Sequence, residues 1–315
     1  MRPQRPVLRY HGGKWLLAPW IISFFPPHRT YCEPFVGAAS VLMRKPRSAA
    51  ECINDLDDRI VAVFRCLRDP AKAEELRRRL ALTPFARAEF EESYSPPADE
   101  IDAVRKTIVL SFMGHGSDSV GRGYRTGFRC KDTESRALPS NEWANWPDQV
   151  PAFVKRLSGV AIERRDAVEV INRFDAPGTL FYVDPPYPTH TRTSSVGKHG
   201  YRHELTDDEH RALSKTLHAV DGMVVLSGYA CPLYDGELYP DWERREKKTL
   251  ADGARPRTEV VWLNTACSAA LVVARRQGVF QLDHRKAGDT DGKEAHQETQ
   301  TEAGARTGVL SAPTA

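Results

Sequence analysis

Short apolar runs with the composition of buried strands occur toward both ends of this 315-residue chain and are missing from its middle. They lie at residues 30–32, 51–53, 160–163, 179–183 and 223–227. Segments with helical spacing separate them, and strands that alternate with helices predict a parallel α/β sheet. Two further runs, 260–263 and 270–273, are expected to close the sheet as an antiparallel pair.

The middle of the chain has a different pattern, which predicts an insert. Residues 68–150 contain helical spacing and loops but no convincing strand. We therefore expect a discontinuous catalytic domain formed by residues 1–67 and 151–284, with residues 68–150 as a helical module between its parts. Residues 285–315 carry almost no large apolar side chain, and this composition predicts a disordered tail.

Composition excludes several classes of protein. No apolar stretch is long enough to cross a bilayer, and residues 1–6 lack the apolar run of a signal peptide, so we expect a cytoplasmic protein. The six cysteines form no CxxC pair, which favours free thiols and argues against a metal site. A net charge of +3 permits nucleic-acid binding without demanding it.

The strongest chemical signal is Asp184-Pro185-Pro186-Tyr187, which follows the apolar run 179–183. Ligands of open α/β sheets bind at the carboxyl ends of strands. There, the Asp184 carboxylate and the Pro185 carbonyl could accept hydrogen bonds from an exocyclic amine and aim its lone pair at an electrophile. Tyr187 could stack on a flipped base, a contact worth about 1–3 kcal/mol. The alternative is a tight turn with an exposed tyrosine.

A second site signal follows the first strand. The segment Glu33-Pro34-Phe35-Val36-Gly37 is a glycine turn, and Asp55 comes 22 positions after Glu33. An acid at about this distance from a glycine turn is suited to binding ribose hydroxyls. No GxGxxG pattern is present, which argues against a nicotinamide-dependent oxidoreductase. The two features, together with residues 184–187, predict a nucleoside cofactor, although each alone could be a structural turn.

Lys14, in Gly12-Gly13-Lys14, has two interpretations. Its ammonium could lie near a carboxylate of the cofactor, or it could be a solvated lysine on a flexible turn.

These motifs, in this order, resemble the Dam-like adenine-specific DNA methyltransferases, phage-type members in particular. The resemblance rests on residues 10–14, 33–37, 53–55 and 184–187 and covers most of residues 7–275. It implies a Rossmann-like, S-adenosylmethionine-dependent methyltransferase sheet with helices on both faces. It also implies that the insert is a mainly helical target-recognition domain.

The resemblance assigns roles by position. The implied cofactor-binding residues are Tyr10, Lys14, Glu33, Phe35, Gly37, Asp55, Asp166 and Asp184. Asp55 would bind the ribose hydroxyls and Asp166 the adenine of the cofactor, while residues 184–187 would hold the target adenine. Tyr10 stands where many relatives have tryptophan, and Ala39 stands where a glycine is common.

The implied reaction is methyl transfer from S-adenosylmethionine to the N6 amine of adenine in a specific sequence of double-stranded DNA. The base would leave the duplex, and the methyl group would move by direct in-line displacement without a metal or a covalent enzyme intermediate. We expect a monomer, in a phage or restriction-modification setting.

DNA contacts are expected from two basic segments. The first, inside the insert, interleaves charge and aromatic rings and contains Arg122, Tyr124, Arg125, Phe128, Arg129 and Lys131. Such residues can reach phosphates and base edges. The second follows residue 187 and contains Arg192 and Lys198. Solvated loops are the alternative interpretation of both.

Other functions stay open at this stage. Methylation of the cytosine amine is usually associated with serine in place of Asp184, and methylation of protein glutamine with asparagine there. RNA is another possible acceptor. A non-catalytic DNA-binding relative should have lost Lys14, Asp55 or Asp184, and all three are present.

Overall fold

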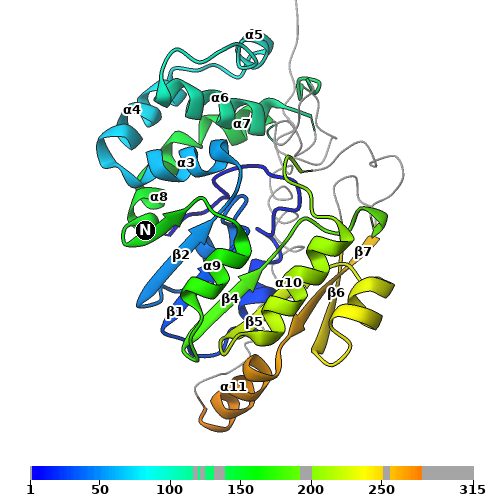
Figure 1. Ribbon diagram of the computed structural model, residues 1–315. Coiled ribbons are helices and arrows are strands. Elements are labelled where there is room, and N and C mark those ends of the chain that lie inside the picture. The colour runs from blue at the N-terminus through cyan, green and yellow to red at the C-terminus, as the bar shows by residue number, and fades with distance from the viewer. Residues whose placement is uncertain are drawn as a thin grey trace, which may run out of the picture. The chain divides into compact units, whose positions relative to one another are not determined.

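In the computed structural model, seven strands form one sheet in the order β3-β2-β1-β4-β5-β7-β6 (Figure 1). The structure describes residues 2–115, 120, 125–130, 139–191, 201–250 and 256–278. The strands are β1 (Thr30–Glu33), β2 (Ala50–Asn54), β3 (Val160–Glu163), β4 (Thr179–Val183), β5 (Met223–Gly228), β6 (Glu243–Leu250) and β7 (Pro256–Leu263). Strands β1 to β5 pair in parallel, and β7 is antiparallel to both β5 and β6. The predicted α/β fold class is confirmed.

Helices cover both faces of this sheet. The helices of the first half are α1 (Ala18–Ile22), α2 (Ser40–Arg44), α3 (Asp58–Arg68), α4 (Pro70–Ala81), α5 (Arg87–Glu92) and α6 (Glu100–Met113). Those of the second half are α7 (Pro139–Ala144), α8 (Val150–Leu157), α9 (Ala167–Phe174), α10 (Asp207–Ala219) and α11 (Thr265–Arg276). Short 3-10 turns occupy Pro147–Gln149 and Thr189–Thr191, and a π-helical turn occupies Leu233–Leu238.

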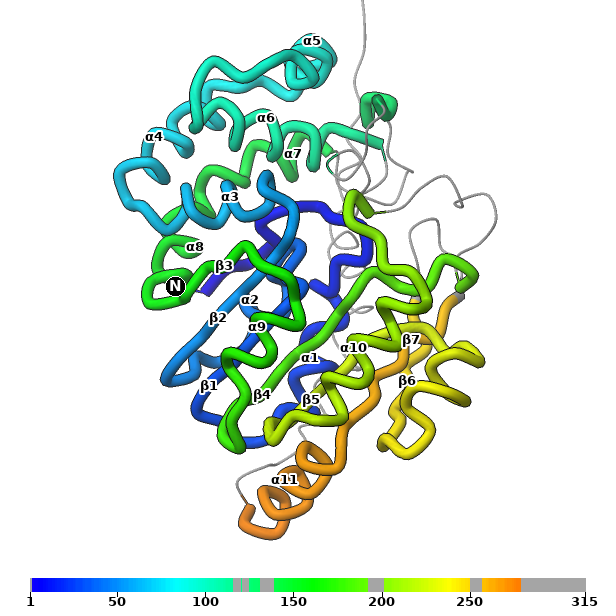
Figure 2. Tube along the Cα trace, viewed as in Figure 1, coloured from blue at the N-terminus to red at the C-terminus, as the bar shows by residue number. Residues whose placement is uncertain are grey.

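Alternation along the strands divides the core into two layers. In β4, Leu180 and Tyr182 belong to the cluster that also contains buried side chains of α1, α2, α3 and α11. Phe181 and Val183 belong to the opposite cluster, with buried side chains of α9 and α10. Successive side chains of a strand point to opposite faces, so a strand covered on both faces is apolar throughout. Figures 1 and 2 show α9 and α10 on the near face of the sheet.

The register of the parallel strands aligns their carboxyl ends. Cys32 of β1 lies opposite Cys52 of β2 and Phe181 of β4. The segments that leave β1, β2 and β4 therefore begin at the same edge of the sheet, where ligands bind in folds of this type.

The expected closing pair of strands is partly wrong. Residues 260–263 do lie in β7, but residues 270–273 lie in α11. The Asn264 side chain accepts a hydrogen bond from the backbone N–H of Cys267 and caps this helix. Its buried face has the helical spacing of Cys267, Leu271 and Ala274, whereas the valines at 272 and 273 are exposed.

The true partner of β7 is β6, which the sequence did not reveal. Its sequence, ERREKKTL, carries six charged residues in eight. As the last strand of the sheet, β6 has a neighbour on one side only. Charged side chains are typical of such edge strands, because they oppose pairing with other chains.

The helices of the middle region pack against α3, which in turn contacts β3. Helices α4, α6 and α8 contact α3, and their buried side chains belong to one cluster with those of α2. Figure 1 shows α4 to α7 grouped above the sheet. The division into a catalytic domain and an insert at 68–150 stays a prediction. The predicted tail, residues 285–315, lies outside the described residues.

Among the described residues, no helix has both the length and the apolar character needed to cross a membrane. Over the same part of the chain, no group of three or more His, Cys, Asp or Glu side chains is arranged to hold a metal ion.

Candidate functional site

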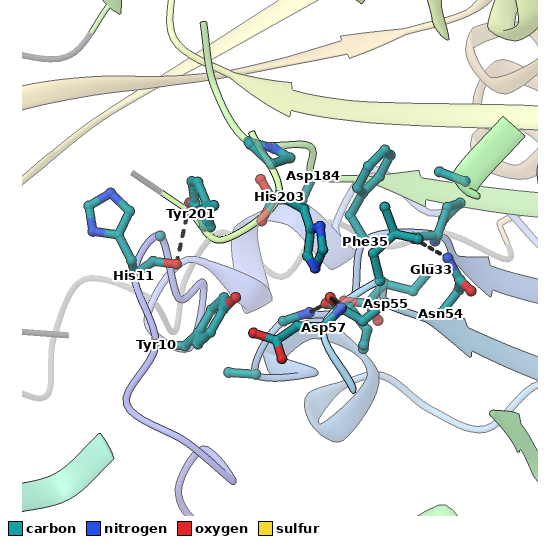
Figure 3. Close-up of a pocket in the computed structure, with 18 of the residues that line it drawn as sticks. Tyr10, His11, Glu33, Phe35, Asn54, Asp55, Asp57, Asp184, Tyr201 and His203 are labelled. Carbon is teal, nitrogen blue, oxygen red and sulfur yellow. Dashed lines mark hydrogen bonds between the residues drawn. The ribbon is translucent and has the colours of Figure 1, made fainter. Parts of the chain in front are cut away.

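A pocket lies at the carboxyl ends of the parallel strands, and the N-terminal segment forms one side of it (Figure 3). It brings together all eight residues predicted to bind the cofactor: Tyr10, Lys14, Glu33, Phe35, Gly37, Asp55, Asp166 and Asp184. These residues come from the N-terminal segment and from the ends of four strands. Of the other predicted catalytic residues, Pro186 also lines the pocket.

The loop after β1 has a left-handed backbone conformation at Gly37, as expected for a glycine turn. Gly37 has a φ of +46°, and a Cβ atom there would lie 3.1 Å from the Tyr10 ring. A side chain at this position would therefore be strained and would push the ring out of place. Ala39 is also left-handed, with a φ of 53°, a conformation that glycine adopts at lower cost than alanine.

Asp55 is held by backbone amides at the end of β2. Its Oδ2 accepts from the Gly37 N–H and its Oδ1 from the Asp57 N–H, both at 2.9 Å. Burial raises the pKa of Asp55 to about 6, although these two hydrogen bonds oppose the shift. A carboxylate has about four acceptor positions, so the group keeps capacity for ligand hydroxyls.

Asp166 lies at the end of the loop after β3, where it caps helix α9. Its Oδ1 accepts from the Val168 N–H at 2.8 Å. Asp166 is exposed and lines the pocket.

Three charged side chains, the buried Lys14 and Glu259 and the half-buried Asp184, form what we call the pocket cluster. The Lys14 ammonium lies 3.0 Å from Asp184 Oδ2 and 3.6 Å from Glu259 Oε1, and it donates to the Gly12 carbonyl. Burial alone would lower the pKa of Lys14, but the attraction of the two carboxylates raises it above its ordinary value. Lys14 is thus a buried cation with two anionic partners and not a solvated turn residue.

Within the pocket cluster, the second carboxylate oxygen of Asp184 gives the most direct indication of a ligand site. Asp184 Oδ1 is buried and has no hydrogen-bond partner among the described residues. Buried polar atoms are nearly always paired, so an unpaired carboxylate oxygen at a pocket indicates that a ligand completes it.

Tyr187 is buried next to the pocket cluster and does not line the pocket. Its hydroxyl donates to Glu259 Oε1, its ring packs edge-on against Tyr229 with centroids 4.6 Å apart, and the Lys14 ammonium lies 4.9 Å from its centroid. The ring is only 5% exposed, so a base could stack on it only after some rearrangement. The half-buried Tyr229 is the more accessible aromatic ring.

Two residues of the site, Ser40 and Glu259, were not assigned from the sequence, whereas Glu33 was. Ser40, at the start of α2, lines the pocket and has a buried Oγ without a partner in the described part of the chain. Burial raises the pKa of Glu33 to about 8; the Tyr31 hydrogen bond opposes the shift and nearby Asp184 adds to it. Glu259 gave no local signal, because it is a single acid in an apolar strand.

Residues 201–205 also line the pocket. The Tyr201 hydroxyl donates to the His11 carbonyl at 3.4 Å. Arg202 pairs with Asp57 and Asp58 at 3.1 and 2.7 Å, which fastens this segment to the start of α3. Figure 3 shows His203 on the side of the pocket where Asp55 and Asp57 lie.

Of the residues expected to contact DNA, Arg125, Phe128 and Arg129 fall in the described ranges. Arg122, Tyr124, Lys131, Arg192 and Lys198 lie outside them. Arg125 lies over the Tyr94 ring, 5.2 Å from its centroid, and Arg129 pairs with Glu142 at 2.9 Å. The ring of Phe128 packs against Phe85.

A mostly parallel seven-stranded sheet flanked by helices, with a ligand pocket at the carboxyl ends of its strands, is the architecture of a Rossmann-like methyltransferase. Residues 10–115 match the family model of the D12 class N6 adenine-specific DNA methyltransferases. The predicted resemblance to the Dam-like enzymes is thereby confirmed over this stretch, about a third of the chain. That family is one of DNA adenine methyltransferases. The matched stretch ends before Asp184.

No curated protein matches this chain.

Proposed function

We propose that this chain transfers a methyl group from S-adenosylmethionine to the N6 amine of adenine in a specific sequence of double-stranded DNA. The observation that carries the proposal is the unpaired, buried Oδ1 of Asp184, at the end of β4 beside the pocket. The family match over residues 10–115 supports adenine in DNA as the acceptor.

The residues of the pocket fit a nucleoside-bearing cofactor. Asp55 can accept from ribose hydroxyls, and the Tyr10 and Phe35 rings provide apolar surface for a base or a methionine chain. The buried Ser40 Oγ lacks a partner among the described residues, as expected for a hydroxyl that a ligand completes. Asp166 offers a carboxylate oxygen to an adenine amine. We therefore assign the pocket to S-adenosylmethionine.

Asp184 and Pro185 would orient the acceptor. The N6 lone pair of adenine is delocalised into the ring, which makes the amine a poor nucleophile. Hydrogen bonds from the two N6 protons to Asp184 Oδ1 and the Pro185 carbonyl would favour a pyramidal nitrogen and fix the direction of its lone pair. The salt bridge from Lys14 to Oδ2 keeps the carboxylate from turning away.

Bound S-adenosylmethionine would supply a methyl group on a sulfonium, whose carbon–sulfur bond breaks with its electron pair going to sulfur. The nitrogen lone pair forms the new bond to carbon. The nitrogen then releases one proton, which the Asp184 carboxylate can receive and pass to water. Asp184 thus acts first as a hydrogen-bond acceptor and then as a proton acceptor.

The target base must leave the duplex to reach this site, which costs a few kcal/mol. We propose that the basic residues predicted from the sequence, Arg125 and Arg129 among them, contribute the compensating contacts with DNA. Arg129 would exchange its salt bridge with Glu142 for a phosphate or a base edge. A monomeric state and a cytoplasmic location stay predictions.

The test is transfer of labelled methyl from S-adenosylmethionine to duplex DNA of varied sequence, followed by nucleoside analysis of the product. We expect labelled N6-methyladenine from the wild type and at least a thousandfold less from Asp184→Asn, because the amide cannot accept a proton and one of its two polar ends is a donor. Label in cytosine, RNA or protein would reject adenine in DNA as the substrate. Cofactor binding without any transfer would favour a non-catalytic relative.

A further inference from the structure

Two side chains of strand β7 contact the packed pair of tyrosines Tyr187 and Tyr229. Arg257 and Glu259 are two positions apart and so lie on the same face of the strand. Each contacts one tyrosine hydroxyl: Arg257 donates to Tyr229 at 3.0 Å, and Tyr187 donates to Glu259. Because the two tyrosine rings pack against each other, β7 fixes both rings from their hydroxyl ends.

Glu259 has a second contact that changes the charge of the site. Its Oε1, which accepts from Tyr187, also lies 3.6 Å from the Lys14 ammonium. Lys14 therefore has two carboxylates against one positive charge, and the pocket cluster carries a net charge of −1 when all three groups are ionised. Glu259 is buried and is not among the residues that line the pocket.

We infer that Glu259 is a positioning residue for methyl transfer: it holds Tyr187 through its hydroxyl and gives the cluster around Asp184 its excess negative charge. The inference rests on the function proposed above and deepens it. Glu259 acts on the reaction only through Tyr187, Lys14 and Asp184.

The charge matters because the acceptor nitrogen becomes positive as its bond to the methyl carbon forms. A largely buried cluster of net charge −1 beside that nitrogen stabilises this state more than it stabilises the neutral amine, and buried charges are weakly screened. Without Glu259, the full charge of Lys14 would act on Asp184. The cluster would then be neutral, and Asp184 would be a weaker acceptor.

Packing alone does not account for an acid at this position. Glu259 precedes four fully buried apolar residues, Val260 to Leu263, on the same strand. Burying a carboxylate there is unfavourable, since replacing buried ion pairs by apolar residues is often neutral or stabilising. A role in the chemistry of Asp184 gives the acid a function in this environment.

Two substitutions separate the two contributions of Glu259. Glu259→Gln keeps an oxygen that can accept from Tyr187 but removes the charge. Tyr187→Phe keeps the ring and the charge of Glu259 but removes the hydrogen bond. Glu246→Gln, an exposed carboxylate on β6, is the matched control.

The assay is single-turnover methylation of a duplex carrying the site mapped with the wild type, with saturating S-adenosylmethionine. We expect Glu259→Gln to lower the rate by about 10- to 100-fold and Tyr187→Phe by about 3- to 10-fold. The dissociation constant of the cofactor, measured by calorimetry, and the KM for DNA should change by less than about threefold. Glu246→Gln should match the wild type.

A fluorescent base, 2-aminopurine, in place of the target adenine adds a readout that does not depend on turnover. Its emission rises when the base leaves the stack. We expect Tyr187→Phe to alter that emission because the Tyr187 hydroxyl no longer fixes residues 184–187, which would hold the base. A purely stabilising role of Glu259 would lower the midpoint of unfolding but leave the single-turnover rate and the emission of the folded protein unchanged.

A wild type without methyl transfer would refute the proposed function itself. An active wild type together with a fully active Glu259→Gln variant would refute only the role of Glu259. If Glu259→Gln does not fold, Glu259→Asp, which keeps the charge but shortens the reach to Tyr187, and Tyr187→Phe are decisive: unchanged rates in both would overturn the inference.

Discussion

Two clusters of three charged side chains occur in the part of the chain that the structure describes, and they differ in the balance of positive and negative charge. The pocket cluster consists of Lys14, Asp184 and Glu259. The second cluster, which we call the strut, consists of Lys45, Glu51 and Arg156. None of the strut residues lines the pocket. Five of the six side chains are buried, and Asp184 is half-buried where it lines the pocket.

Both oxygens of the one carboxylate in the strut, that of Glu51, accept hydrogen bonds. Glu51 Oε1 accepts from Lys45 at 2.7 Å and from Arg156 at 2.9 Å, and Oε2 accepts from Arg156 at 2.6 Å. Two cations face one anion. Burial alone would raise the pKa of Glu51, but the hydrogen bonds from Arg156 and Lys45 outweigh it and lower the pKa.

The pocket cluster has the opposite balance, with two anions, one cation and an unpaired oxygen on Asp184. Burial raises the pKa of Glu259, against the attraction of Lys14 and the hydrogen bond from Tyr187. A fully paired cluster holds elements together, whereas an incompletely paired one of excess charge can bind a ligand that completes it. This difference distinguishes the candidate site from structural ion pairs elsewhere in the chain.

Removing the buried lysine of each cluster should give the largest contrast. Lys14→Met leaves two carboxylates without their cation, and we expect it to lower the free energy of unfolding by about 3–5 kcal/mol at pH 8. Lys45→Met leaves Glu51 bound by both arms of Arg156, so the expected loss is about 1–2 kcal/mol. Urea unfolding of the two variants and the wild type measures both.

The Lys14→Met loss should also shrink below pH 6. Without Lys14, one of the two carboxyls would have a raised pKa and would bind a proton in the folded state, which relieves the repulsion at low pH. Equal losses for the two lysine variants at pH 8 would contradict the distinction between the clusters.

Glu33 and Glu51 give a second contrast, in pH dependence. Both are buried glutamates on neighbouring strands, but the pKa of Glu33 is raised to about 8 and that of Glu51 is lowered. Between about pH 4.3, where an unfolded glutamate titrates, and pH 8, the folded protein binds more protons at Glu33 than the unfolded chain does. Glu33 therefore makes stability fall as the pH rises through this window.

Glu33→Gln should remove that fall, because glutamine stays neutral and can still accept from the Tyr31 hydroxyl. Relative to the wild type, the variant should gain on the order of 2–3 kcal/mol between pH 5 and pH 8. Glu51→Gln should instead be less stable than the wild type by an amount that hardly changes over this range, since Glu51 is ionised throughout it in both states. Urea unfolding at four pH values provides the comparison, and parallel curves for Glu33→Gln and the wild type would show that Glu33 is ionised.

The sequence predicted those parts of the site that lie within a few residues of a strand end. Residues 33–37, 55 and 184–187 follow strands β1, β2 and β4 directly, so recognising the strands also located the pocket. Residue 166 follows β3 in the same way. Chemistry and position agreed at each of these points because ligand sites in such sheets form where the strands end.

What the sequence did not predict depends on distant pairing. The importance of Glu259 comes from contacts with residues 14 and 187, which no local pattern connects. The misassigned run 270–273 was apolar because two exposed valines lie beside the buried face of a helix, and β6 was missed because an edge strand need not be apolar. The spacing of apolar residues predicts which side chains are buried in a typical helix or strand. Helix α11 and strand β6 are not typical in this respect.

The smallest predicted effect concerns Ser40. Its buried Oγ, like Asp184 Oδ1, has no hydrogen-bond partner among the described residues, and it would lie on the cofactor's side of the pocket. Ser40→Ala removes a buried hydroxyl without a partner in the described part of the chain, so it should raise the free energy of unfolding by up to about 1 kcal/mol. If S-adenosylmethionine forms a hydrogen bond with this hydroxyl, the same change should weaken the binding of the cofactor by about 2- to 10-fold.

Ser93→Ala is the matched control, because the buried Ser93 Oγ donates to the Glu89 carbonyl at 2.7 Å. Its loss should lower stability by about 1 kcal/mol and leave cofactor binding unchanged. Calorimetric titration together with urea unfolding distinguishes the two serines. A Ser40→Ala variant that binds the cofactor as tightly as the wild type would restrict the unsatisfied part of the pocket to Asp184.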